Sequence, residues 1–133
     1  FDGEFHRVDA ASINPRPNKA VPVWFGGSAP VVLKRAAELG DGWMPLEGPN
    51  ERMQAAVAQL KQYRSDAGRS WDDFGIQAQV QWARGTPEKW LRARDTWTQL
   101  GASHLAIATH QADPTDCAGH LARLEEVLEV VRG

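Results

Sequence analysis

The sequence predicts an α/β fold with the architecture of half a (β/α)₈ barrel, and three observations lead to this prediction. The hydrophobic period alternates between about two and about 3.6 residues through four repeats, as in a parallel sheet covered by helices. The chain has 133 residues, whereas a whole barrel needs about 250. The predicted strand at 74–82 is apolar on one face and rich in glutamine on the other. A small doubly wound sheet competes with this interpretation, but helices cover both of its faces, so both should be apolar.

Residues 1–20 are predicted to form an N-terminal arm, and residues 21–133 to form the four βα repeats. The arm contains Asn14-Pro15-Arg16-Pro17-Asn18. Proline lacks a backbone donor and restricts the residue before it to extended conformations. We therefore expect a loop, with at most a short edge strand near 5–8.

Each repeat consists of a short apolar strand followed by an amphipathic helix. Gly40 is expected to end the first helix, Asn50 to cap the second, and Thr86-Pro87 to open the third. Asp113-Pro114 is expected to open the last helix, whose inner face would carry leucines and valines from Leu121 onward. The strands are predicted at 22–26, 42–45, 74–82 and 104–109.

Composition argues against several classes of function. The net charge is −2 and the basic residues are scattered among acids, so the charge pattern of a nucleic-acid-binding protein is missing. No apolar run is long enough to span a bilayer. Cys117 is the single cysteine, which precludes an intramolecular disulfide and indicates a cytoplasmic protein. The chain begins without Met, which suggests a piece of a longer reading frame or a processed product. No cluster has metal-ligand spacing.

The turn after the first predicted strand is the leading candidate for a binding site. Gly26 and Gly27 carry no Cβ, and Ser28 comes directly before a helix. A helix N-terminus offers unpaired N–H groups and a positive dipole end, so an anionic ligand such as a phosphate is expected there. The alternative is a plain tight turn, in which the glycines supply positive φ angles and Ser28 caps the helix.

Further candidates lie near the carboxyl ends of the later strands, where barrel enzymes place their chemistry. His110 follows the fourth strand and is the catalytic candidate, because an imidazole there can polarise a carbonyl or move a proton. Gln81 and Arg84 lie near the end of the third strand, where an amide or a guanidinium can meet a phosphate or an acidic tail. For Arg84 and His110, the alternative is a solvent-exposed side chain without a ligand.

Four segments taken together resemble the later half of the bacterial luciferase-like oxidoreductases, which use FMN or the deazaflavin coenzyme F420. The resemblance covers most of the chain and is densest from Phe1 to Pro45. The segments that carry it are Phe1-Asp2-Gly3-Glu4-Phe5, Ile13-Asn14-Pro15-Arg16-Pro17, Val21 to Ala29, and Arg35-Ala36-Ala37-Glu38-Leu39-Gly40-Asp41-Gly42-Trp43.

The resemblance implies a (β/α)₈ barrel that passes hydride between a flavin-type cofactor and a small organic substrate. It implies that the cofactor phosphate sits at Gly26, Gly27 and Ser28, and that Trp43 and Met44 border the cofactor. An FMN-dependent monooxygenase and a non-catalytic binding or assembly module are the alternatives. Family members also carry four earlier βα units, so this chain is expected to pair with such a half or with a second copy of itself.

Overall fold

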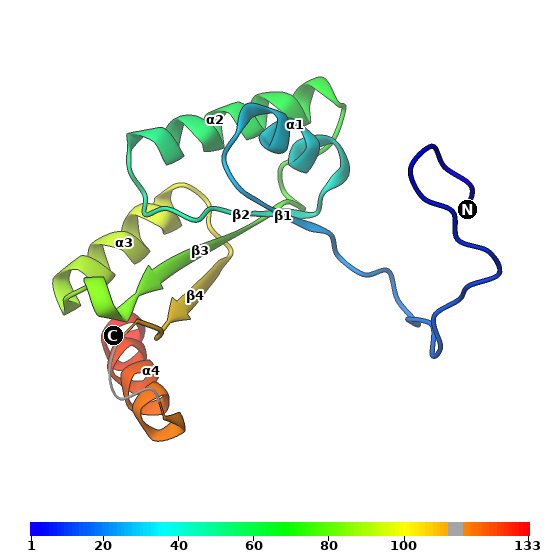
Figure 1. The fold of residues 1–133 in the computed structure, drawn as a ribbon. Helices are drawn as coiled ribbons and strands as arrows, with labels where there is room; N and C mark the ends of the chain where they lie inside the picture. Colours follow the sequence, from blue (N-terminus) through cyan, green and yellow to red (C-terminus); the bar gives the residue numbers. More distant parts are fainter. Residues whose placement is uncertain (112–115) are drawn as a thin grey trace.

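The computed structural model describes residues 1–111 and 116–133 of the chain. Within them, four strands alternate with four α-helices, as Figure 1 shows. The strands are β1 (Trp24–Gly26), β2 (Gly42–Met44), β3 (Gly75–Gln81) and β4 (His104–Ala108). The helices are α1 (Pro30–Leu39), α2 (Glu51–Asp66), α3 (Pro87–Gln99) and α4 (Cys117–Arg132). A short 3₁₀ helix, η1 (Trp82–Arg84), follows β3.

The four strands form one parallel sheet in the order β1-β2-β3-β4. This sequential order is that of a barrel wall, because a doubly wound sheet reverses its strand order at a switch point. The predicted α/β half-barrel is therefore confirmed. In Figure 1 the helices α1, α2 and α3 lie along one side of the sheet.

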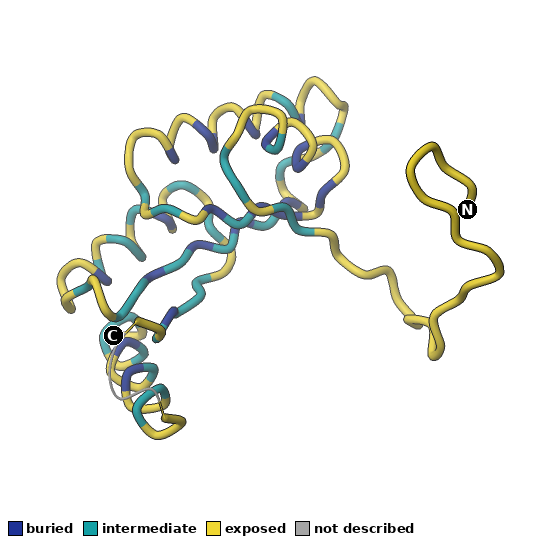
Figure 2. Tube along the Cα trace, viewed as in Figure 1, coloured by how far each residue is buried: buried dark blue, intermediate teal, exposed yellow. Residues whose placement is uncertain are grey.

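The two faces of β3 differ as its sequence predicts. Ile76, Ala78 and Val80 are buried under the helices, and the glutamines between them are half-exposed on the opposite face. Figure 2 shows the resulting alternation of buried and intermediate residues along this strand. Successive side chains of a strand point to opposite faces, so the glutamine face is the concave, lumen side of the barrel wall.

Helix starts follow the predicted capping chemistry. The Asn50 side chain accepts a hydrogen bond from the Met53 amide at 3.0 Å, and Thr86 accepts one from the Lys89 amide at 3.4 Å. The predicted start at Asp113-Pro114 lies outside the described residues, and Asp116 caps α4. Each predicted strand differs from the observed one by one or two residues at one or both ends. For example, β3 ends at Gln81 because the chain turns into η1 at the next residue.

The core has two parts, one between the sheet and α1, α2 and α3, and a smaller one around Val80, Trp90 and Val127. The prediction for α4 was partly wrong, because Leu121 is 54% exposed. A charged residue, Arg123, occupies the buried side of this helix instead, with its guanidinium 5.3 Å from the Trp82 ring. Its aliphatic stem can pack like an apolar side chain while the head group finds polar partners.

The N-terminal arm extends away from the sheet, as Figures 1 and 2 show. Its regular structure within the described residues is limited to one antiparallel bridge between Asp2 and Arg7. This bridge replaces the short edge strand expected near 5–8. Apolar side chains on the arm are exposed, including Phe1, Phe5 and Ile13.

Candidate functional site

The turn between β1 and α1 is open. Gly27 has φ of +101°, a left-handed conformation that glycine adopts without strain. A Cβ placed on Gly27 would have its nearest neighbour, Val32 Cγ1, at 3.7 Å. Neighbouring side chains therefore do not fill the turn, and a ligand can approach its backbone.

The start of α1 has unused donors. Its N-cap residue is Ala29, which makes no side-chain cap. The part of the alternative interpretation in which Ser28 caps this helix is therefore wrong, whereas Gly27 has the positive φ angle that it expects. Within the described part of the chain, the backbone amides of Ser28, Ala29 and Val31 have no hydrogen-bond acceptor. These N–H groups and the helix dipole together make a site that favours an anion.

A side chain of β2 holds this turn in place, and the residue before β2 fixes the other end of β1. The indole N–H of Trp43 donates to the Gly27 carbonyl at 2.6 Å, and an Asp41 carboxylate oxygen accepts from the Val23 amide at 2.8 Å. Trp43 is fully buried, and its ring packs against Trp97. This position gives Trp43 a supporting role: it fixes the Gly27 carbonyl, and its ring is covered from a ligand at the turn.

A cation beside the turn was missed by the sequence reasoning. Arg52 donates to the Ser28 hydroxyl at 2.9 Å and to a Glu47 carboxylate oxygen at 2.6 Å. The two arginine contacts come from different nitrogens of one guanidinium, so Glu47 orients the side chain toward the turn. Arg52 follows the Asn50 cap in the first turn of α2, and helices of parallel βα units start at one edge of the sheet. Because the starts of α1 and α2 lie at the same end of the sheet, the position of Arg52 in the sequence could have predicted that it lies close to the turn.

Of these groups, Ser28 and Arg52 border an open depression of about 270 Å³ between α1 and α2. Its lining combines polar and apolar side chains, as in sites that hold one charged end of a small molecule. The lining residues are Ser28, Leu33, Arg52, Ala55, Ala56 and Gln59.

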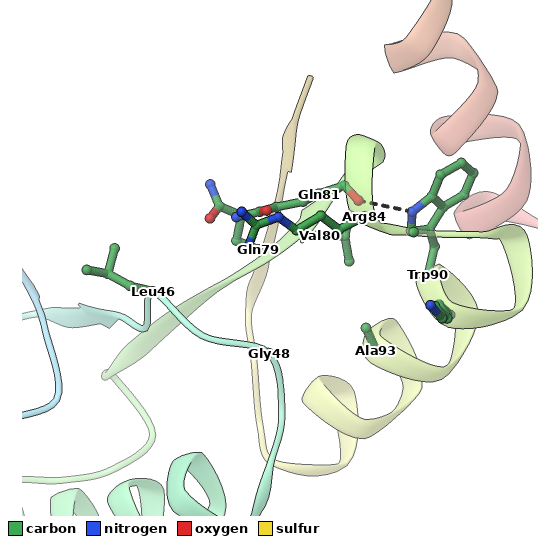
Figure 3. Close-up of a pocket in the computed structure, with 10 residues that line it drawn as sticks. Leu46, Gly48, Gln79, Val80, Gln81, Arg84, Trp90 and Ala93 are labelled. Carbon is green, nitrogen blue, oxygen red and sulfur yellow. Dashed lines mark hydrogen bonds between the residues drawn. The ribbon is translucent and has the colours of Figure 1, made fainter. Parts of the chain in front are cut away.

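A second cavity of about 240 Å³ lies where β2 and β3 separate. These strands pair only at Gly42–Gly75 and Trp43–Ile76, so a gap opens beyond the last paired residues. Figure 3 shows the polar ends of Gln79, Gln81 and Arg84 on the side of β3 that faces Leu46. The structure thus brings the predicted residue Gln81 to a cavity, but not to the Gly27 turn.

His110 stands apart from both cavities. It is exposed and follows β4, at the far edge of the sheet from β1. Three strand spacings separate these edges, which is about 14 Å along the sheet. The catalytic role expected for His110 stays a prediction.

A polar cluster also joins the end of β4 to α4. The His120 Nδ1 lies 2.8 Å from the Thr109 hydroxyl, and Arg123 donates to the Thr109 carbonyl at 3.3 Å. Arg123 Nη1 is also 3.4 Å from His120 Nδ1, and an arginine can only donate, so this nitrogen is the acceptor. The cluster fixes the position of α4 on the sheet.

The described residues hold no group of three or more acids, histidines or cysteines arranged to bind a metal ion. Among the helices described, none is long and apolar enough to cross a membrane.

The fold and the turn define a class: a parallel βα barrel wall with an open, glycine-containing turn at the carboxyl end of a strand. Over residues 1–129 the sequence matches the family described as luciferase-like monooxygenase. The chain belongs to this family.

Relatives and solved structures agree with the family. An F420-dependent glucose-6-phosphate dehydrogenase of Mycolicibacterium smegmatis is 31% identical over 103 residues, which are 75% of this chain and 31% of that protein. An F420-dependent secondary alcohol dehydrogenase in complex with an F420-acetone adduct superposes with a TM-score of 0.73 at 14% identity. The match covers 100% of this chain and 56% of that one.

A third similar structure is the coenzyme F420-dependent tetrahydromethanopterin reductase of Methanopyrus kandleri. It superposes with a TM-score of 0.58 at 13% identity, over 81% of this chain and 49% of that one. The chain thus spans about a quarter to a third of the curated relatives that it matches and about half of these two structures. At these identities the two solved structures establish the fold.

Proposed function

We propose that the chain is the C-terminal half of a barrel oxidoreductase that holds the deazaflavin coenzyme F420 by its phosphate at the β1–α1 turn. The observation that carries this proposal is the open turn at Gly27 and Ser28, with unused amides and the Arg52 guanidinium beside it. Family membership supports the proposal, as do the F420-dependent relatives.

Each group at the turn has a distinct task in this proposal. Gly26 and Gly27 keep the approach to the backbone free of side chains. The amides of Ser28, Ala29 and Val31 would donate to phosphate oxygens, and Arg52 would add a charge-assisted hydrogen bond. When bound, the coenzyme supplies hydride transfer at its ring. The protein's contribution is to fix the ring against a small organic substrate.

The remaining barrel wall is part of the proposal. β1 and β4 are the edges of the sheet, and the glutamine face of β3 is a lumen wall. Four further βα units, carried by an N-terminal half or by a second copy of this chain, would close the barrel and cover both edges. The single cysteine supports a cytoplasmic location.

Coenzyme titration tests the proposal. The chain is titrated with F420 and, separately, with FMN, and binding is followed by the fluorescence of each coenzyme. We expect saturable F420 binding that weakens by about tenfold to a hundredfold in Arg52→Gln, since a charge-assisted hydrogen bond is worth about 1.5–3 kcal/mol. Arg35→Gln, which alters an exposed cation of α1, is the control and should change nothing.

The other outcomes separate the alternatives. Binding of FMN with oxygen consumption by the reduced form would indicate an FMN-dependent monooxygenase. Saturable binding of neither coenzyme, with the far-ultraviolet circular dichroism of a folded protein, would leave a non-catalytic module.

A further inference from the structure

The cavity at the end of β3 carries two cations that the proposed coenzyme site does not use. Arg84 and Lys89 are exposed and line the cavity. Within the described residues neither side chain has an ion-pair or hydrogen-bond partner. The adjacent acid, Glu88, is engaged by the Thr86 hydroxyl at 2.8 Å. The positive charge on this wall is therefore available to a ligand.

Two glutamines of β3 add neutral hydrogen-bond donors to the cavity, and the end of β3 that carries them is held in place by a hydrogen bond. Gln79 and Gln81 are half-exposed toward the cavity and supply carboxamide N–H groups. Trp90 is buried, and its indole N–H donates to the Gln81 carbonyl at 3.3 Å. This bond ties the first turn of α3 to the end of β3, so the residues around the two cations are held in place.

We propose that this cavity binds an anionic substituent, a phosphate or a carboxylate, of a ligand of the enzyme. Arg84 would bind two oxygens of such a group through its planar fork, Lys89 would add a point charge, and the glutamines would donate to the remaining oxygens. This inference rests on the proposed oxidoreductase function and gives a chemical class to its ligand.

One loop connects this cavity with the β1–α1 turn. Leu46 and Gly48 line the cavity, and Glu47 between them holds the Arg52 guanidinium that reaches Ser28. The two anion sites thus border the two sides of residues 45–50. The anionic group at Arg84 belongs either to the organic substrate or to an acidic tail of the coenzyme, and both present the same chemistry.

A paired titration tests the inference. The intrinsic tryptophan fluorescence of the chain is followed during titration with glucose 6-phosphate and with glucose, without coenzyme. We expect the phosphate ester to bind at least tenfold more tightly than the parent sugar. The double variant Arg84→Gln/Lys89→Gln should remove this preference, and Arg92→Gln, which alters an exposed cation of α3 outside the cavity, should retain it.

A second arm identifies the source of the anion. F420 and the same deazaflavin ring without phosphate and acidic tail are titrated into wild type and the double variant. If the double substitution weakens glucose 6-phosphate, the anion is the substrate's; if it weakens F420 alone, the anion is the coenzyme's tail. Either result supports the cavity as an anion site.

The inference is overturned if neither affinity in the double variant differs from that of Arg92→Gln. This result is distinct from failure of the proposed function, in which wild type binds no coenzyme at all while the sugar-phosphate arm still reports on Arg84 and Lys89. All three substituted side chains are exposed, so circular dichroism should show an unchanged fold.

Discussion

Arg64→Met is predicted to be one of the most destabilising substitutions in this chain. The Arg64 side chain is 1% exposed and lies at the end of α2, beneath the end of α1. It donates to the carbonyls of Ala37 and Gly40 at 3.2 Å each and to that of Ser70 at 2.7 Å. It also pairs with the Asp73 carboxylate at 3.0 Å. Burial lowers the pKa of this guanidinium, yet it stays charged because its ordinary value is so high.

The magnitude follows from the groups that lose their donor. Methionine fills similar volume but has no donor, so the buried carbonyls of Ala37 and Gly40 lose this partner, whereas the carbonyl of the exposed Ser70 can be hydrated. Each buried acceptor without a partner costs about 1–3 kcal/mol. The Asp73 side chain is 74% exposed, so its carboxylate is rehydrated and adds little. We expect a loss of about 3–5 kcal/mol, which is a large share of the 5–15 kcal/mol typical of a domain.

Urea denaturation followed by circular dichroism measures this loss. Lys61→Met on the same helix is the control: its ammonium lies over the exposed side of Trp71 at 5.2 Å, and it should lose less than about 1 kcal/mol. Arg64→Lys keeps the charge but replaces the fork by a single ammonium, so it should recover only part of the stability. An Arg64→Met midpoint equal to that of Lys61→Met would refute the reasoning.

Two further predictions concern the turn and a helix start. Trp43→Phe should lower the free energy of unfolding by about 1 kcal/mol more than Trp97→Phe does. The reason is that Trp43 loses a hydrogen bond to the Gly27 carbonyl, whereas the buried Trp97 N–H has no partner among the described residues. Equal denaturation midpoints of the two variants in urea would contradict this. The pKa of Glu88 is lowered, first by its own backbone N–H and then by the Thr86 hydroxyl. This stabilising contribution is present above the unfolded pKa and is lost as the pH falls through the folded one. In Thr86→Val an NMR titration should show the pKa of Glu88 raised but still below its ordinary value, and an unchanged value would exclude the Thr86 contribution.

The sequence predicted most of the fold because its signals are local. Alternation along β3 and the caps at Asn50 and Thr86 each act within a few residues. Arg123 was missed because the prediction of the buried side of α4 relied on the spacing of apolar residues, and an arginine does not contribute to that pattern. Its burial depends on Trp82 and Thr109, which are remote in sequence.

The candidate site was predicted only in part, for the same reason. The glycines and Ser28 mark the turn directly in the sequence. Arg52 acts there through a contact between residues 24 apart in the chain, and only the arrangement of neighbouring βα units creates it. Trp43 was expected to border the cofactor, and the structure shows a contact that the sequence does not reveal: its indole donates to the Gly27 carbonyl from within the core.

The two-faced pattern of β3 also restricts how this strand can align during folding. Because side chains alternate with a period of two, a slip of one residue against β4 would place three carboxamides under the helices and three apolar side chains in water. Each displaced carboxamide would lose its hydration without gaining a partner. The alternation of apolar and glutamine side chains along β3 therefore makes misaligned pairings of this strand energetically unfavourable.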